Sequence, residues 1–135
     1  MAAPDVWDLY AEYAELDRAG LTSAQQAVLA VLDLRQEVNS GGFDSYFRYW
    51  GGDTAPLALA SLPQLLGQDW ADLLREAMAT LGPTYPPTAD ARTAALDAHD
   101  MNDELAALDD RFYELEGAVD ADSRLNAYLH DDEER

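Results

Sequence analysis

The sequence lacks several residue types on which common protein functions depend. It contains no cysteine and no lysine among its 135 residues, and only two histidines. Without cysteine, neither a disulfide framework nor a thiolate metal site can form. The first residues lack the basic start and apolar run of a signal peptide, and no apolar run approaches the roughly 18 residues that span a bilayer. We therefore expect a cytoplasmic protein that does not enter the membrane.

Sequence motifs for catalysis and cofactor binding are also missing. The chain has no Gly-x-Ser-x-Gly nucleophile motif, no His-Glu-x-x-His zinc motif and no Asp-x-Asp-x-Asp-Gly calcium loop. The glycine pairs at 41–42 and 51–52 match neither phosphate-binding pattern, and no lysine is available to contact a phosphate. His99 and Asp100 could in principle belong to a Ser–His–Asp triad, but no local sequence pattern supports one. The sequence therefore predicts a protein that is not an enzyme, with no catalytic residues, no metal site and no cofactor.

The balance of charge is the most informative property of the sequence. Twenty-seven aspartates and glutamates face eight arginines, which gives a net charge of −19 at pH 7. Such a surface repels nucleic acid and anionic membranes and attracts cations and basic proteins. An alternative explanation is that the acids only keep the protein in solution. Disorder is excluded because 48% of the residues are hydrophobic.

Apolar residues recur with the period of an amphipathic helix along most of the chain, and no stretch keeps the period of a strand. We expect an all-α fold, a single compact domain of seven to eight helices that comprises residues 1–135. Ser23 and Gln26 have the spacing of a capping box, Thr88 can cap a later helix, and Pro63 should kink or end its helix. The predicted helices comprise residues 4–17, 23–39, 43–50, 54–66, 69–81, 88–98, 103–117 and 121–129, and residues 130–135 are expected to fray.

A Gly-Gly pair separates an apolar helix from a short aromatic one. Phe43, Tyr46, Phe47 and Trp50 follow at i, i+3, i+4 and i+7, so they share one helix face. Glycine adopts positive φ readily, and Gly41 is expected to be the left-handed residue that ends the first helix. The aromatic helix after this glycine corner is therefore predicted to form the centre of the fold.

Acidic residues fall on single faces of two predicted helices. In the first helix they recur at spacings of three and four over about 15 Å of helix axis. Such rows can imitate the phosphates of one DNA strand, although most charged rows are simply solvated helix faces. The candidate partner-binding residues are Asp5, Asp8, Glu12 and Glu15 in the first helix, and Asp103, Asp110 and Glu114 in the helix at 103–117, with Asp109 and Glu116 flanking them.

The stretch from Glu37 to Phe47 carries a resemblance to a known family. Its sequence, Glu-Val-Asn-Ser-Gly-Gly-Phe-Asp-Ser-Tyr-Phe, resembles the Asn-Gly-Gly-Phe-x-Gln-Tyr/Phe-Phe signature of the DNA-mimic-protein-nineteen family. Three further features are similar to that family: Gly-Gly-Asp at 51–53 before a leucine-rich helix, Arg92 after the proline-rich loop, and Leu-Asp-Asp-Arg-Phe-Tyr at 108–113.

This resemblance covers residues 25–129 and departs from the family pattern at two positions. Ser40 interrupts Asn-Gly-Gly, and Ser45 stands where glutamine is usual. The family takes its name from all-helical, dimer-forming members whose acidic surface looks like DNA and occludes a DNA-binding regulator. The structural signature, expected to turn the chain and pack in the core, comprises Asn39, Gly41, Gly42, Phe43, Tyr46, Phe47, Phe112 and Tyr113.

Charge and resemblance together lead to one main hypothesis. The chain is predicted to be a non-enzymatic, acidic protein-binding module that mimics DNA and blocks the basic nucleic-acid-binding face of a regulator. The first alternative is an immunity protein that covers a nucleic-acid-targeting toxin, and the second is a helical domain with no charge-dependent partner. The expected partner is therefore a basic nucleic-acid-binding protein or toxin, with no direct binding of nucleic acid or membrane, and the resemblance implies a possible homodimer.

Overall fold

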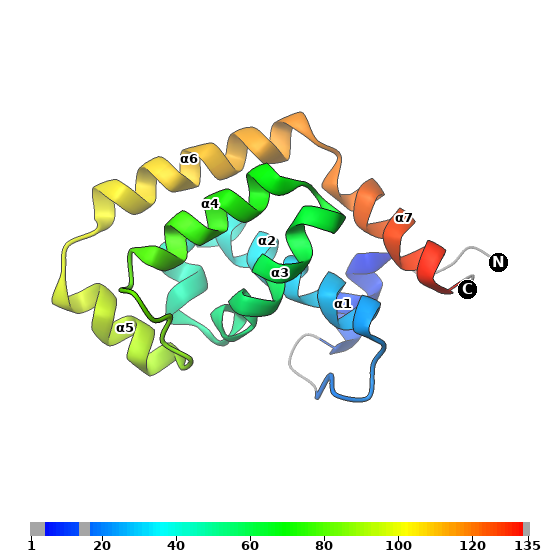
Figure 1. Ribbon diagram of the computed structural model, residues 1–135, viewed down its shortest axis with the longest axis horizontal. Coiled ribbons are helices and arrows are strands. Elements are labelled where there is room, and N and C mark those ends of the chain that lie inside the picture. The colour runs from blue at the N-terminus through cyan, green and yellow to red at the C-terminus, as the bar shows by residue number, and fades with distance from the viewer. Residues whose placement is uncertain (1–4, 14–16, 134–135) are drawn as a thin grey trace.

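The computed structural model describes residues 5–13 and 17–133, which form seven α-helices and one short 3-10 helix (Figure 1). No β-strand occurs in these two ranges, so the predicted all-α fold is confirmed. None of the helices in them is long and apolar enough to cross a membrane. In chain order the elements are α1 (Val6–Tyr13), α2 (Ser23–Arg48), η1 (Trp50–Thr54), α3 (Ala55–Leu65), α4 (Gln68–Ala79), α5 (Ala89–Ala98), α6 (Asn102–Ala118) and α7 (Ala121–Glu133).

Helix α2 lies at the centre of the molecule. It contacts α1, α3, α5, α6 and α7, and in Figure 1 these helices surround it, with α6 along the top of the view and α5 at one end. Residues 27–35 are all buried, including the charged Asp33 and Arg35, so neighbours cover every side of the helix there. The long apolar stretch in the sequence is therefore a fully enclosed helix.

The glycine corner is a kink in α2 at which Gly41 and Gly42 leave helical geometry and separate two helical segments, as predicted. Gly42 has a φ of +78° and a ψ of −179°, whereas Gly41 has a φ of −151°. The left-handed residue is therefore Gly42, and the expectation that Gly41 would hold this conformation was wrong. The kink redirects the last two turns of α2 so that Phe43 and Phe47 enter the core, where both are fully buried.

The aromatic cluster after the kink forms the core at one end of the molecule. Phe43 stacks on Phe47 with ring centroids 6.0 Å apart and meets Phe112 of α6 edge-on at 5.9 Å. Trp70 of α4 contacts the same Phe112 ring at 5.3 Å. Trp50 does not join them, contrary to prediction, because the chain becomes extended at the preceding residue and leaves Trp50 38% exposed in η1.

Helix ends differ from the predictions by one to a few residues. The capping box of α2 belongs to Thr22 and Gln25, because Thr22 Oγ1 accepts from the Gln25 N–H at 3.1 Å and Gln25 Oε1 accepts from the Thr22 N–H at 2.9 Å. The predicted Ser23 box was therefore shifted by one residue. Thr88 caps α5 as predicted, with Oγ1 3.1 Å from the amide nitrogen of Ala91. Pro63 lies in the last turn of α3, where its missing N–H removes only one helical hydrogen bond.

Helix α7 is longer than the sequence indicated. It continues to Glu133, so residues 130–133, which were expected to fray, are helical. Leu125 and Leu129 are buried on its inner face, and no proline or glycine follows them to stop the helix. Helix α1 comprises Val6–Tyr13. Residues 4 and 14–16 of the predicted helix lie outside the described residues, and the described residues Asp5 and Asp17 are not helical.

Candidate functional site

Arg92 is the most thoroughly bonded charge in the interior. Its side chain is fully buried, and its guanidinium donates to the carbonyl oxygens of Phe47, Tyr49 and Pro86 at 2.8, 3.0 and 3.1 Å. It also donates to Asp53 at 2.6 Å. These bonds connect α5 to the end of α2, to η1 and to the proline-rich loop. Arg92 is therefore an architectural residue and does not contribute to the surface.

Asp33 is a second buried charge, in the middle of α2. It accepts two hydrogen bonds from Arg18 at 2.7 and 2.9 Å and a third from the Thr54 hydroxyl at 2.7 Å. Burial raises the pKa of Asp33 above its ordinary value, although the bonds from Arg18 and Thr54 oppose this shift. Burial and the nearby Asp33 carboxylate also raise the pKa of the Tyr10 phenol. Asp33 thus links α1, α2 and η1 from inside the fold.

Glu116, a predicted partner-binding residue, instead pairs with an interior arginine. Arg35 of α2 donates to both Glu116 oxygens at 2.7 and 2.8 Å and to Asp122 at 2.7 Å. Trp7 of α1 donates its indole N–H to the same Asp122 oxygen at 2.8 Å. Burial opposes ionisation of Asp122, but the bonds from Arg35 and Trp7 outweigh it and lower the pKa of that carboxyl. This network joins α1, α2, α6 and α7.

Asp109 also has a structural role, which explains why glycine is required at position 42. Its Oδ1 accepts the backbone N–H of Phe43 at 2.8 Å, so a side chain from α6 caps the aromatic segment of α2. The rest of the carboxylate lies against Gly42, where any Cβ would collide with it. Burial raises the pKa of Asp109, while the Phe43 N–H partly offsets this effect. Gly42 therefore satisfies two requirements at once, a positive φ and space for Asp109.

The remaining signature residues divide between the core and its edge. Tyr46 and Phe112 are buried. Tyr113 is 44% exposed, but its hydroxyl donates to the Val38 carbonyl oxygen at 3.2 Å. Asn39 donates to Glu116 at 3.2 Å from an exposed position. The signature thus marks the seam between α2 and α6.

Helix α1 uses most of its predicted acidic row for its own structure. Asp5 accepts the Trp7 N–H at 2.8 Å and the Asn126 side-chain amide at 3.0 Å, and Asp8 accepts the Asp5 N–H at 3.2 Å. Both residues remain exposed, as does Glu12, which makes no hydrogen bond or ion pair to the described residues. Glu15 lies outside the described residues. The row therefore offers one unengaged carboxylate that the structure describes.

The outer face of α6 presents its carboxylates differently. Asp103, Asp110 and Glu114 are exposed and form no hydrogen bond or ion pair within residues 5–13 and 17–133. Helix α4 lies beside α6 (Figure 1), and the two are bridged by an ion pair of 2.7 Å between Arg111 and Glu76. Asp69 and Asp72 of α4 line the same depression as Glu114 of α6. We define the α4/α6 acidic face as Asp69, Asp72, Glu76, Asp103, Asp110 and Glu114.

The three acids of α4 were missed in the sequence, although a signal for them exists. Asp69, Asp72 and Glu76 recur at spacings of three and four, which places them on one side of a helix. Nothing in the sequence indicates that this side adjoins α6. Tertiary packing therefore assembles a face from two helices that are separated by more than twenty residues.

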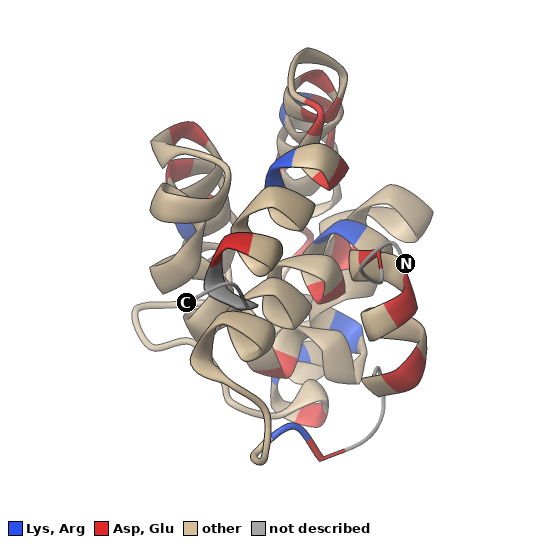
Figure 2. Ribbon diagram, turned by 90° about the vertical axis from the view of Figure 1, so that its right-hand side faces the viewer, with Lys and Arg blue, Asp and Glu red and all other residues tan. Residues whose placement is uncertain are grey.

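The two predicted acidic rows do not merge into one track. Helix α1 packs on α2 and α7, whereas α6 packs on α2 and α4. In Figure 1 α6 runs along the top of the molecule, and α1 lies below it, beside α7. In Figure 2 the acids are spread over several helices and do not form one continuous line. The α4/α6 acidic face is consequently the larger single candidate surface.

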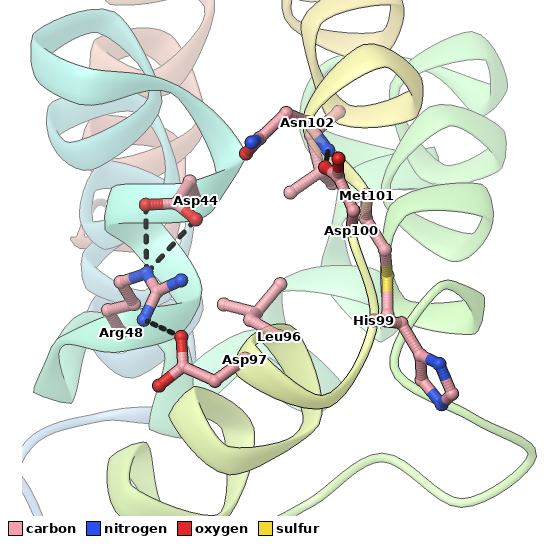
Figure 3. A pocket seen from close by; sticks show the side chains of 9 residues that line it. Asp44, Arg48, Leu96, Asp97, His99, Asp100, Met101 and Asn102 are labelled. Carbon is pink, nitrogen blue, oxygen red and sulfur yellow. Dashed lines mark hydrogen bonds and ion pairs between the residues drawn. The ribbon is translucent and has the colours of Figure 1, made fainter.

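A cavity of about 250 Å³ lies at the start of α6 (Figure 3). Arg48 lies in it and is held by Asp44 at 2.9 Å and by Asp97 at 3.0 Å. The imidazole of His99 points away from Arg48 and Asp97 in Figure 3. No cluster of three or more histidine, aspartate or glutamate residues in the described ranges could hold a metal ion. The cavity offers an ion-paired arginine and no arrangement for nucleophilic chemistry.

Comparison with models of protein families places the chain in a known family. A family model described as DMP19-like protein matches residues 19–132. This range contains α2 through nearly all of α7 and leaves out α1. Neither a curated protein nor a solved structure matches the chain.

Proposed function

We propose that the chain, which belongs to the DMP19-like protein family, mimics DNA and occludes the basic nucleic-acid-binding face of a regulatory protein. The family points to a DNA-mimic type of function and to a DNA-binding protein as the partner. Assigning this activity to a particular surface and to a regulator goes beyond the family. The contact surface proposed is the α4/α6 acidic face.

One observation carries this assignment. Asp103, Asp110 and Glu114 are exposed on one side of α6 and have no cationic neighbour bonded to them in the described ranges. Like charges three and four residues apart destabilise a helix by a few tenths of a kcal/mol per pair. Asp110 and Glu114, four residues apart, therefore repel each other, and none of the three carboxylates bonds to another helix in the described ranges. Asp109 and Glu116 differ from them, because their hydrogen bonds hold helices together.

The mechanism is competition for arginine and lysine side chains. Asp110 and Glu114 are separated by about 6 Å along the helix axis, and duplex DNA has a phosphate about every 3.4 Å along each strand. Carboxylates at this spacing can replace phosphates in some of a partner's salt bridges. Because the attraction is electrostatic, association should be fast and should weaken as salt is added.

Neutralising the outer row of α6 tests this proposal. The triple variant Asp103→Asn, Asp110→Asn, Glu114→Gln is immobilised and exposed to extract of the host cell at low ionic strength, and bound proteins are eluted with duplex DNA. The wild-type chain should retain a nucleic-acid-binding protein that the duplex releases, and the variant should retain at least about tenfold less of it.

A matched control variant neutralises three carboxylates outside the α4/α6 acidic face, so its net charge changes by the same amount. The control is Glu12→Gln, Asp90→Asn, Asp131→Asn, which removes exposed carboxylates from α1, α5 and α7. It should retain the partner nearly as well as wild type. Equal capture by both triple variants, or a captured protein that duplex DNA does not release, would exclude mimicry by this face. A captured nuclease toxin would instead favour the immunity-protein alternative.

A further inference from the structure

The α4/α6 acidic face contains a groove whose shape goes beyond a row of charges. A depression of about 370 Å³ lies between the two helices and is lined by Asp69, Asp72, Leu73, Arg111, Glu114, Leu115 and Ala118. The residues at its two walls show that α4 and α6 run in opposite directions, because the start of α4 adjoins the end of α6. Two helices packed in this way leave a groove into which the side chains of a third helix can insert.

The floor of this groove is apolar. Leu73 is buried beneath the floor, Leu115 packs against the core and is partly exposed, and Ala118 is exposed at the end of α6. A mimic that only replaced phosphates would need carboxylates alone. A partner that covers this floor has to bring apolar side chains as well as cations, since burying apolar area is the favourable part of the contact.

The acidic residues on the two rims of the groove favour a positively charged binding partner. Asp69 and Glu114 stand on opposite walls, and neither forms an ion pair to another described residue. The two arginines nearby are already paired, Arg111 with Glu76 at 2.7 Å and Arg75 with Asp72 at 3.0 Å. Charge complementarity therefore selects an occupant with lysine or arginine on both sides of its apolar residues.

We expect the segment that occupies the groove to be a helix, because a bound segment needs partners for its own backbone N–H and C=O groups. Both walls are helices, whose N–H and C=O groups are bonded internally except in the terminal turns. They therefore offer no continuous row of free backbone groups with which an extended segment could pair, as it does at a sheet edge. A helix brings its backbone hydrogen bonds with it and needs only side-chain contacts. A helix in this groove places apolar residues at i, i+3, i+4 and i+7 on the floor.

We propose that the α4/α6 groove binds a basic amphipathic helix of the partner, with its apolar stripe on Leu115 and Ala118 and its cations on Asp69 and Glu114. This assignment rests on the proposed function, because it specifies which segment of a basic partner contacts the α4/α6 acidic face. It differs from mimicry by charge alone in one measurable respect, namely that the pattern of apolar residues in the partner matters as well as its charge.

A pair of designed peptides tests the groove directly. One peptide of about 14 residues, about 20 Å of helix, contains only leucine and lysine arranged so that the leucines form one helix face. Its isomer has the same composition in an order that leaves no apolar helix face. In titration calorimetry with the full chain, the amphipathic peptide should bind with one-to-one stoichiometry and at least about tenfold more tightly than its isomer.

Two alanine-to-arginine variants on the same helix locate the contact. Ala118→Arg places a long cation in the groove, and Ala106→Arg places the same side chain at an exposed position that does not line it. With the Ala118→Arg variant, the dissociation constants of the two peptides should differ by no more than about threefold. With Ala106→Arg, the amphipathic peptide should still bind about tenfold more tightly than its isomer. Both positions are exposed, and circular dichroism melting checks that both variants fold.

The outcomes separate this inference from the function on which it rests. If the two peptides bind wild type equally, or if Ala118→Arg behaves like Ala106→Arg, the groove does not bind a helix, whatever the charge dependence. If the peptides differ as expected while partner capture is insensitive to Asp103, Asp110 and Glu114, the groove binds a helix, but the cation contact at Glu114 and DNA mimicry by the outer row are both excluded.

Discussion

Asp109 and Asp110 are neighbours on α6, yet the interior and the outer face of this molecule use the same side chain differently. Asp109 turns toward α2, accepts the Phe43 N–H at 2.8 Å and has a pKa raised by burial. Asp110 lies about 100° further around the helix, is exposed, and has no bonded partner in the part of the chain that the structure describes. One carboxylate stabilises the fold, and the other adds charge to the surface.

The same contrast holds for the two regions as a whole. Interior charges such as Arg92 and Asp33 each have several hydrogen-bond partners from different elements. Arginines on the outer face, such as Arg75, have one exposed partner within the same helix. Charges in the interior should therefore determine stability, and charges on the outer face should determine binding.

Replacing Arg92 should give the largest loss of stability and tests whether interior charges determine stability. Arg92→Leu leaves three carbonyl oxygens and Asp53 without their donor, so we expect a loss of about 3–5 kcal/mol of unfolding free energy. Arg75→Leu removes an exposed pair and should cost less than about 0.5 kcal/mol. Urea denaturation of both variants measures the difference. Similar losses of unfolding free energy in the two variants would show that interior and outer charges do not differ in their effect on stability.

Replacing Gly42 should have an intermediate effect. Alanine at this position has to adopt a φ of +78° and collides with Asp109, so Gly42→Ala should lose about 1–3 kcal/mol of unfolding free energy. Gly117 is an ordinary helical residue of α6 with open space within 4 Å of the place that a Cβ would take, and Gly117→Ala should stabilise by up to about 0.5–1 kcal/mol. Thermal melting compares the two, and a stable Gly42→Ala protein would show that the kink is not required.

The pH dependence of stability should show the smallest effect. The pKa values of Asp33 and Asp109 are raised in the folded chain, so between the unfolded and folded values the folded chain binds more protons. Unfolding free energy should therefore rise as the pH is lowered from neutral toward the ordinary aspartate pKa of about 4, and fall as the pH is raised again. Urea denaturation at a series of pH values measures this slope.

Asp109→Asn sharpens the pH experiment. The amide oxygen of asparagine can still accept the Phe43 N–H, so the fold should persist while part of the pH slope disappears. Asp103→Asn removes an exposed carboxylate of the same helix and should leave most of the slope in place. A slope that both variants reduce equally would arise from general charge repulsion and not from Asp109.

Much of the fold could be predicted from the sequence because its signals are local. The 3.6-residue period of apolar residues predicted the helices, and Thr88 was identified as a cap from its type and place. The errors were also local: Thr22 and Ser23 are both good caps one residue apart, and Gly41 and Gly42 can both take a positive φ. Only the position of Asp109 decides between the two glycines.

The candidate surface could be predicted only in part. Helical spacing placed Asp103, Asp110 and Glu114 on one face, but the same reasoning included Asp109 and Glu116, which bond to α2. Spacing describes one helix and carries no information about which neighbour covers which side. For α1, the row that looked similar in the sequence is largely engaged in capping and in contacts to Asn126.

By itself, the sequence determined the helical class, the acidic character and the family, because these depend on residue type, period and a contiguous motif. Tertiary structure decided which carboxylates are available to a partner, and it joined α4 to α6 to form the groove. The physical reason is that a charge has a different role according to what lies within about 3 Å of it, and those neighbours come from distant parts of the chain. Arg35 and Glu116, bonded at 2.7 Å, are separated by 81 positions.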